Sequence, residues 1–321
     1  MLLVPSDWSG SVSVTATNQL LTPANRTLAH VSTPQFGLDF VADAQPRPGL
    51  ISWWRGEGNA SDAMGVHPGT PLGGLAYTAG QVGQAFSLNG QNAAVALGDW
   101  FTLQQFTLSL WVKPGETQMQ HADLLDNNHS SYRSWVLQSA NESDATRSYW
   151  LWHIGEPSGG WQIRFWLTRG AWQHWVVTLG TDRVQSLYLD GKLAGSFTNT
   201  GPLTYDGTQY FNLDKNRVFG RYFKGLVDEL MLFDRPLSPA EVASVYVSQG
   251  GRPTLEMQPD PGGVLLSWPA GANPTLENRT SLGSGSWETV TNAVFVPAGD
   301  RTTVLLPATN GQRFFRLKAG N

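Results

Sequence analysis

Seven tryptophans lie between residues 135 and 175, and polar side chains are interleaved with them. A tryptophan ring stacks on the flat C–H face of a sugar, and Asn, Gln and Arg side chains hydrogen-bond to sugar hydroxyls. Trp150 and Trp152 are two residues apart, and Gln162, Arg164 and Trp166 follow at the same spacing, so each set shares one face of a strand. The residues predicted to bind carbohydrate are Trp150, Trp152, Gln162, Arg164, Trp166 and Asn127.

The same tryptophans also have a purely structural interpretation, because a large β-sandwich buries several aromatic rings in its core. Trp166 is favoured as an exposed ring, since it lies on the side of its strand opposite Phe165 and Leu167. We expect most of the rings to be buried and at least one to be exposed.

Carboxylates in a catalytic arrangement are not evident. A retaining glycosidase needs two carboxyl groups about 5–5.5 Å apart, which alternation along one strand supplies. Glu142 and Asp144 have a suitable spacing but lie in a polar turn, and Arg147 stands where a further acidic residue would be needed. Asp228 and Glu229 are adjacent, so a regular strand would point them to opposite faces. The sequence therefore predicts a protein that is not an enzyme.

The elements that must position these residues are strands, and the clearest of them covers residues 226–233. It is apolar on both faces, with Leu226, Leu230 and Leu232 on one predicted face, which favours a central place in a sheet. A helix follows, for which Ser238 is the predicted N-cap and Glu241 completes a capping box.

This strand and helix resemble the closing motif of the laminin-G-like, concanavalin-A-like jelly-roll domains of secreted bacterial proteins. Segments 80–90 and 170–178 resemble further strands of that family, and Asp190-Gly191 predicts its type I′ hairpin turn. The matching residues of the closing motif are Gly225, Val227, Asp228, Glu229, Arg235, Leu237, Ser238 and Glu241.

The resemblance implies an all-β fold, a two-sheet jelly-roll sandwich, over residues 49–251. Residues 252–321 resemble a smaller fibronectin-type-III-like β-sandwich, with Trp268, Leu276, Trp287, Leu305 and Phe314 as its expected core. Residues 1–48 contain too few strands for an independent core, and we interpret them as a partial β segment or the remnant of a preceding domain, followed by a linker.

The resemblance also implies calcium as a structural cofactor, because such jelly rolls often bind one ion with oxygen ligands. Asp228 is the implied ligand, with the Gly90 carbonyl and Asp62 as partners. The alternative is that Asp228 pairs with Arg55 or Arg221, or accepts backbone N–H donors.

Composition excludes several classes of protein. Charged residues are 14% of the chain and the net charge is −4 without a basic block, so the electrostatic footprint of a nucleic-acid-binding protein is missing. Cysteine is absent, which removes disulfides and thiol catalysis. No apolar run reaches the ~18 residues of a membrane span, and the N-terminus lacks the pattern of a signal peptide.

These observations together predict a non-catalytic carbohydrate-binding module of a secreted or cell-surface bacterial multidomain protein. Its expected partners are a polysaccharide or glycan and the other domains of a longer parent chain, without nucleic acid and without membrane insertion. Two alternatives remain open: a structural or adhesion spacer without a sugar ligand, and a glycoside hydrolase of the concanavalin-A-like fold with an unfamiliar carboxylate pair.

Overall fold

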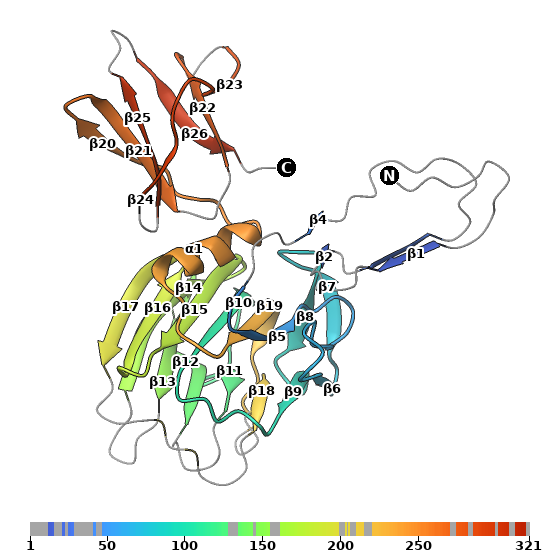
Figure 1. Ribbon diagram of the computed structural model, residues 1–321. Helices are drawn as coiled ribbons and strands as arrows, with labels where there is room; N and C mark the ends of the chain where they lie inside the picture. The colour runs from blue at the N-terminus through green and yellow to red at the C-terminus, as the bar shows by residue number, and fades with distance from the viewer. Residues whose placement is uncertain are drawn as a thin grey trace, which may run out of the picture. The chain divides into compact units, whose positions relative to one another are not determined.

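In the residues that it describes, the computed structural model shows an almost entirely β protein with one helix (Figure 1). The chain divides into two compact units, Met1–Pro48 and Gly49–Asn321. The structure describes residues 12–15, 21–22, 25–28, 41–42, 47–127, 134–143, 146–154, 161–198, 203, 205, 210–214, 220–269, 274–281, 285–298, 301–307 and 312–318.

The jelly roll consists of two antiparallel sheets that enclose one core. The eight-stranded sheet has the order β17-β16-β15-β10-β19-β8-β7, with β5 also paired to β19. Its strands are β5 (Leu50–Trp54), β7 (Ala76–Ala79), β8 (Gln84–Asn89), β10 (Phe106–Pro114), β15 (Gln173–Leu179), β16 (Val184–Leu189), β17 (Lys192–Thr198) and β19 (Lys224–Phe233).

The seven-stranded sheet has the order β14-β13-β12-β11-β18-β9-β6. Its strands are β6 (Thr70–Leu72), β9 (Ala94–Gly98), β11 (Asp123–Asp126), β12 (Trp135–Ser143), β13 (Arg147–Ile154), β14 (Trp161–Thr168) and β18 (Phe211–Leu213). The two-sheet all-β sandwich predicted from the sequence is confirmed.

Alternation along the strands explains which side chains fill the core. In β10, Phe106, Leu108, Leu110 and Val112 are buried between the sheets, as their spacing predicts. The type I′ turn after β16 is also confirmed, because Asp190 has φ 50° and Gly191 has φ 74°.

A β-bulge in β19 changes the faces that simple alternation predicts. The pairing with β10 shifts between Ser109 and Trp111, and Glu229 takes the left-handed conformation with φ 54°. Val227 therefore joins Leu230 and Leu232 in the core. The prediction that Leu226 shares a face with Leu230 is wrong, because the extra residue reverses the alternation beyond the bulge.

Helix α1 (Pro239–Ser248) follows the closing strand and begins with the predicted capping box. Ser238 Oγ accepts the Glu241 N–H, and Glu241 Oε2 accepts the Ser238 N–H at 2.8 Å. On its inner side Tyr246 stacks on Trp111, with ring centroids 5.5 Å apart. The helix thereby covers part of the outward face of the eight-stranded sheet.

The C-terminal segment forms a β module with a separate core, made of Leu266, Trp268, Leu276, Val304 and Leu306. Leu305, predicted to be core, is exposed instead, because it alternates with two buried neighbours. The module has one sheet of order β20-β21-β25-β24 and another of order β23-β22-β26. The strands are β20 (Glu256–Asp260), β21 (Gly263–Pro269), β22 (Thr275–Arg279), β23 (Glu288–Thr289), β24 (Val296–Ala298), β25 (Arg301–Pro307) and β26 (Phe314–Lys318).

The N-terminal unit is described only in four short strands. β1 (Val12–Thr15) pairs with β3 (Asn25–Leu28), and β2 (Leu21–Thr22) pairs with β4 (Val41–Ala42).

Candidate functional site

A stripe of aromatic and basic side chains runs along the outward face of β13 and β14. The inward face of β14 carries Ile163, Phe165 and Leu167 in the core, so Arg164 and Trp166 point away from the core, as predicted. Arg164 is exposed and Trp166 is half-buried. β14 is the edge strand of its sheet. Such a stripe is open to a ligand that lies along the edge.

Trp166 is held in place by two neighbours. Its cross-strand partner on β13 is Tyr149, and the two ring centroids are 4.8 Å apart with an interplanar angle of 43°. The Arg147 guanidinium carbon lies 4.7 Å from the Trp166 ring centroid. Such a cation–π contact at the surface contributes ~0.5–1 kcal/mol.

Further along the stripe, Gln162 pairs with His153 across the strands. The side chain of Gln162 lies outside the described part of the structure. Burial lowers the pKa of His153, which favours the neutral imidazole.

Two of the predicted sugar-binding tryptophans are core residues instead. Trp150 and Trp152 are both 0% exposed, because they share the inward face of β13. Trp152 Nε1–H donates to Gln185 Oε1 at 2.7 Å, which satisfies its polar group inside the sandwich. Their assignment to a sugar site is wrong: alternation placed them on one face but did not say which face.

Asn127, the remaining predicted sugar ligand, is also buried. Its side-chain Nδ2 donates to the Phe101 carbonyl at 3.1 Å and to Ser134 Oγ at 3.2 Å. These bonds connect the end of β11 to Phe101 and Ser134, and they occupy the Asn127 amide inside the sandwich. The assignment of Asn127 to the sugar site is therefore not supported. The stripe itself retains Trp166 and Arg164, with the newly found Tyr149 and Arg147 beside them.

The three predicted calcium ligands do not form one site. The Asp62 carboxylate accepts the N–H groups of Trp53, Met64, Val66 and His67 at 2.7–3.1 Å, so its oxygens hold its own loop together. Gly90 lies beside Lys224, whereas Asp228 is four residues further along β19, or about 13 Å at the rise of a strand.

Asp228 accepts backbone donors, which was one of the alternatives. Its Oδ2 accepts the Val82 N–H at 2.9 Å, so it holds the turn between β7 and β8. Burial raises the pKa of Asp228 to about 8, the backbone donors of Val82 and Gln81 oppose the rise, and the charges of Glu229 and Glu57 add to it.

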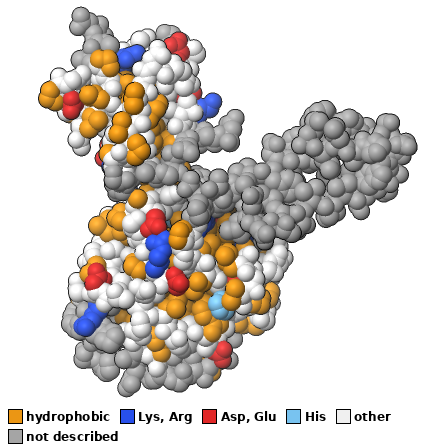
Figure 2. Space-filling view, in the orientation of Figure 1, with side chains coloured by type: hydrophobic (Ala, Val, Ile, Leu, Met, Phe, Trp, Pro, Cys, Tyr) orange, Lys and Arg blue, Asp and Glu red, His pale blue; other side chains and the backbone are white. Residues whose placement is uncertain are grey.

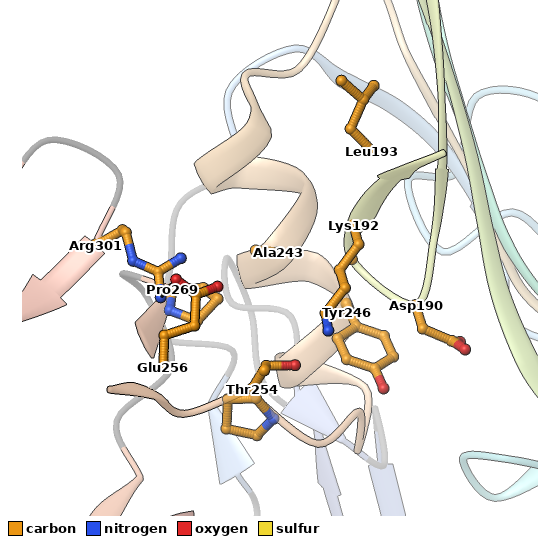
Figure 3. A pocket seen from close by; sticks show the side chains of 11 residues that line it. Asp190, Lys192, Leu193, Ala243, Tyr246, Thr254, Glu256, Pro269 and Arg301 are labelled. Atoms are coloured by element: carbon orange, nitrogen blue, oxygen red, sulfur yellow. Dashed lines mark ion pairs between the residues drawn. The ribbon is translucent and has the colours of Figure 1, made fainter. Parts of the chain in front are cut away.

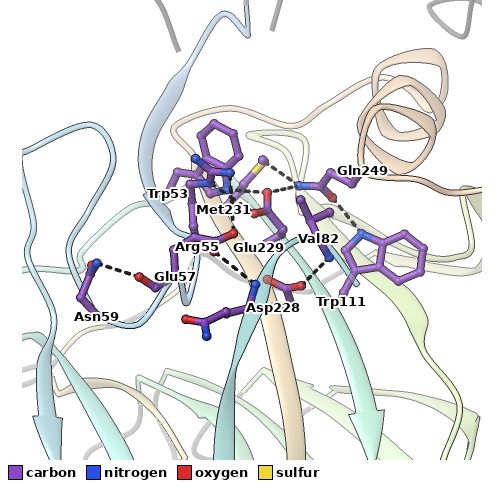
Figure 4. A network of polar contacts seen from close by, with 11 residues as sticks. Trp53, Arg55, Glu57, Asn59, Val82, Trp111, Asp228, Glu229, Met231 and Gln249 are labelled. Atoms are coloured by element: carbon purple, nitrogen blue, oxygen red, sulfur yellow. Dashed lines mark hydrogen bonds and ion pairs between the residues drawn. The ribbon is translucent and has the colours of Figure 1, made fainter. Parts of the chain in front are cut away.

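Glu229 is the centre of a buried polar network on the same face of the sheet (Figure 4). It accepts Trp53 Nε1–H at 2.9 Å, Gln249 Nε2–H at 3.1 Å and Arg55 Nε–H at 3.4 Å. Trp111 Nε1–H in turn donates to Gln249 Oε1 at 3.1 Å. The network connects β5, the first strand of the jelly roll, with β10, with the closing strand β19 and with the end of α1. Each carboxylate of the Asp228-Glu229 pair therefore has a structural partner, and the bulge puts both on one face rather than on opposite faces.

Sequence reasoning missed a group of polar residues on β11 and β18. Asp123 and Asp126 sit opposite Gln138 and Val136 of β12, and Asn212 pairs with Asp126. The alternation of Asn212, Leu213 and Asp214 was a visible signal. The shared face of Asp123 and Asp126 was not, because it depends on a bulge between Asp123 and Leu125.

A pocket of about 210 Å³ lies between the Asp190-Gly191 turn, α1 and the first strands of the C-terminal module (Figure 3). Its aromatic residue is Tyr246, whose ring already stacks on Trp111. Glu256 and Arg301 in its wall form an ion pair of 3.0 Å. One face of the Tyr246 ring is therefore already occupied by Trp111.

On the face shown in Figure 2, the Lys, Arg, Asp and Glu side chains of the described residues are scattered rather than gathered into a patch. Among the described residues, no helix has the length and hydropathy needed to cross a membrane.

The family model of the Concanavalin A-like lectin/glucanases superfamily matches residues 89–243. The match covers most strands of both jelly-roll sheets, including the stripe on β13 and β14. It agrees with the architecture of the sandwich.

Among solved structures, the chain is similar to domain 4 of AbnA, an extracellular GH43 arabinanase from Geobacillus stearothermophilus, in complex with arabinotriose. The identity is 23%, the TM-score is 0.51, and the similarity covers 61% of this chain and 98% of that one. The binding domain of botulinum neurotoxin serotype D/C VPI 5993 is 10% identical with a TM-score of 0.51, covering 85% of this chain and 79% of that one. The binding domain of Paraclostridial Mosquitocidal Protein 1 is 13% identical with a TM-score of 0.50, covering 82% and 69%. These similarities show a fold shared with binding domains of larger proteins.

Proposed function

We propose that this chain is a non-catalytic carbohydrate-binding module that binds a polysaccharide or glycan along the outward face of β13 and β14. The observation that carries the proposal is the half-buried Trp166, supported by Tyr149 and flanked by the basic side chains Arg147 and Arg164. The aromatic ring supplies a stacking surface and the arginines supply donors to hydroxyl oxygens.

The size of the stripe suits a short stretch of polymer. From residue 162 to residue 166 it extends ~13 Å along β14, at ~3.3 Å per residue. β14 is an edge strand, and the stripe lies on the outward face of the sheet rather than in a pocket. We therefore expect internal segments of a polymer, rather than a free chain end, to be the ligand.

The role of the module follows from its type of ligand. A binding module linked to other domains raises their effective concentration on an insoluble or extended polymer. The expected setting is a secreted or cell-surface bacterial protein, and the C-terminal segment is expected to be a fibronectin-III-like spacer.

Affinity electrophoresis in gels that contain single polysaccharides tests this proposal. The wild-type chain should be retarded by at least one polymer, and Trp166→Ala should weaken that binding by about 2 kcal/mol, or roughly 30-fold in Kd, as for a central aromatic anchor. The matched control is Trp287→Ala in the C-terminal module, since Trp287 is also half-buried and also stacks with arginines, Arg279 and Arg316.

Retardation that is lost in Trp166→Ala and kept in Trp287→Ala supports the stripe as the binding surface. If neither the wild type nor any variant is retarded by any polymer of a broad panel, the spacer function replaces the proposed one. Release of reducing sugar by the purified protein would instead favour the glycoside hydrolase.

A further inference from the structure

The outward face of the three-stranded sheet in the C-terminal module is rich in basic side chains. Leu276 on β22 and Leu317 on β26 are paired across the strands and pack in the core of the module. The alternate residues of both strands therefore point away from the core. These outward residues are Thr275, Glu277 and Arg279 on β22 and Phe314, Arg316 and Lys318 on β26. Basic residues thus outnumber acidic ones on this face, in a chain whose net charge is −4.

Trp287, which directly precedes β23, packs against two of these arginines. The guanidinium carbons of Arg279 and Arg316 each lie 4.4 Å from the Trp287 ring centroid. Trp287 is half-buried, so part of its ring is accessible. The indole ring and the two guanidinium groups form one group of side chains, which we call the Trp287 cluster.

One arginine of the Trp287 cluster already has a carboxylate partner. Arg316 Nε–H donates to Glu277 Oε2 at 2.7 Å, and Arg316 Nη2 lies 2.6 Å from the same oxygen. Glu277 is 6% exposed, so this ion pair is partly shielded from water. The pair shows that a glutamate side chain fits against an arginine that packs on Trp287.

Arg279 has the same contact with the ring but lacks a carboxylate. Among the described residues it forms no ion pair, and its buried Nε–H has no hydrogen-bond partner. Charge-assisted bonds to a carboxylate are the strongest that a guanidinium group makes, and the neighbouring ring offers apolar surface. We propose that the Trp287 cluster docks an acidic peptide segment of a partner protein, with one carboxylate on Arg279 and an apolar side chain on Trp287.

A peptide is favoured over an acidic polysaccharide by two observations. The carboxylate that this face binds within the module belongs to a glutamate side chain, on Arg316. Two guanidinium groups already share the Trp287 ring, which leaves less of it for a sugar to stack on. The exposed Lys318 adds positive charge that attracts an acidic segment. This function is separate from the polysaccharide binding proposed for β13 and β14.

Fluorescence anisotropy on the full chain tests the docking surface, with a labelled glutamate-rich peptide that contains one leucine as the probe. The wild type should bind this peptide saturably at low ionic strength, and added salt should weaken the binding. A second peptide has glutamine in place of every glutamate. It should bind about tenfold more weakly or worse, because the carboxylates are missing.

Variants of the Trp287 cluster should change the affinity in both directions. Arg279→Gln should weaken binding of the glutamate-rich peptide about tenfold. Glu277→Gln should strengthen it about threefold, because it releases Arg316 for a ligand carboxylate. The loss of a merely structural contact would not raise the affinity. The matched control is Arg301→Gln, which removes an arginine of the same module that is paired with Glu256 at 3.0 Å. It should change the affinity less than about twofold.

Two further variants keep the test decisive. Arg279→Lys retains the charge without the planar set of donors, so it replaces Arg279→Gln if circular dichroism shows that the latter does not fold, and it should weaken binding severalfold. Trp287→Ala should also weaken binding, because it removes the apolar surface. The proposal is overturned if the wild type does not bind the peptide, or if the Arg279 and Trp287 variants bind it as tightly as the wild type does.

Polygalacturonate, an acidic polysaccharide, serves as a competing ligand. If it binds more tightly than the peptide and loses that binding in Arg279→Gln, the peptide proposal is wrong and the Trp287 cluster binds an anionic glycan. Peptide binding and retardation by neutral polysaccharides are independent measurements. The failure of either proposal therefore leaves the other standing.

Discussion

Asp228 is buried, its Oδ2 accepts the Val82 N–H at 2.9 Å, and the carboxylates of Glu229 and Glu57 place two more negative charges near it. A group in this position favours its neutral form, which gives it a pH-dependent effect on stability. Its pKa is about 8 in the folded chain and 3.8 as the ordinary value. At pH values between 3.8 and about 8, the folded state binds more protons at Asp228 than the unfolded state does. The Asp228 carboxyl group therefore lowers the free energy of unfolding as the pH rises.

We expect Asp228→Asn to remove that dependence. Relative to wild type, the variant should gain on the order of 1–3 kcal/mol between about pH 4 and pH 8, and the difference should be flat below pH 4. Urea denaturation at several pH values measures it, with the exposed Asp99→Asn as the control. Parallel pH profiles for wild type and Asp228→Asn would show that Asp228 is ionised in the folded chain at neutral pH.

Single residues were predictable where the signal is local. The capping residues Ser238 and Glu241 and the Asp190-Gly191 turn were assigned correctly, because each depends on only a few neighbouring positions. The burial of Trp150 was not predictable, since a spacing of two identifies a shared face but both faces of β13 carry aromatic residues. The conformation of Glu229 depends on three paired strands that are distant in sequence.

At the scale of elements, α1 covers part of the outward face of the eight-stranded sheet, and polar contacts of Glu241 stabilise its first turn. Glu241 binds Arg235 through two hydrogen bonds of 2.6 and 3.0 Å and also bonds to Ser238. The Arg235 partner, more than the Ser238 bonds, lowers the pKa of Glu241 to about 2. The contacts of Glu241 at the first turn of α1 should therefore remain until the pH falls below the usual pKa range of a glutamate.

We expect Ser238→Ala to lower the free energy of unfolding by about 1 kcal/mol, the usual cost of losing an N-cap. Ser244→Ala is the matched control, because it makes the same substitution in the interior of α1, where alanine is the better helix former. Chemical denaturation monitored by near-ultraviolet circular dichroism is suitable, since Tyr246 on α1 stacks with Trp111 on β10. Equal stabilities for the two variants would contradict a role for the cap.

At the scale of the whole molecule, the jelly roll and the C-terminal module have separate hydrophobic cores. A fragment of residues 49–251 should therefore fold alone and keep any polysaccharide binding of the full chain. Its boundary must follow Gln249, because that side chain bonds to Glu229 inside the sandwich. Cooperative thermal unfolding of the fragment with native-like tryptophan fluorescence is the expected result, and a fragment without tertiary structure would show that the C-terminal module is required.

The architecture was more accessible from sequence than the site. Runs of alternating residues and turn signals indicated a two-sheet sandwich, because each strand is encoded within about ten residues. The site depends on which face of β13 is open, and the burial of Asp123 and Asp214 depends on how β11 pairs with β18. Those relations arise only from pairings between distant segments.

The place of β19 in its sheet also has a consequence for how the protein is made. This last strand of the jelly roll pairs with β5, β8 and β10, and it brings Glu229 to Trp53, which is 176 residues earlier in the chain. On the ribosome, the earlier strands must therefore wait with unpaired edges until β19 emerges. Pairing over such a distance is slow, and exposed edges attract other chains. A nascent chain that stops before residue 224 is thus expected to aggregate, and chaperones or rapid export would be needed most during this interval of synthesis.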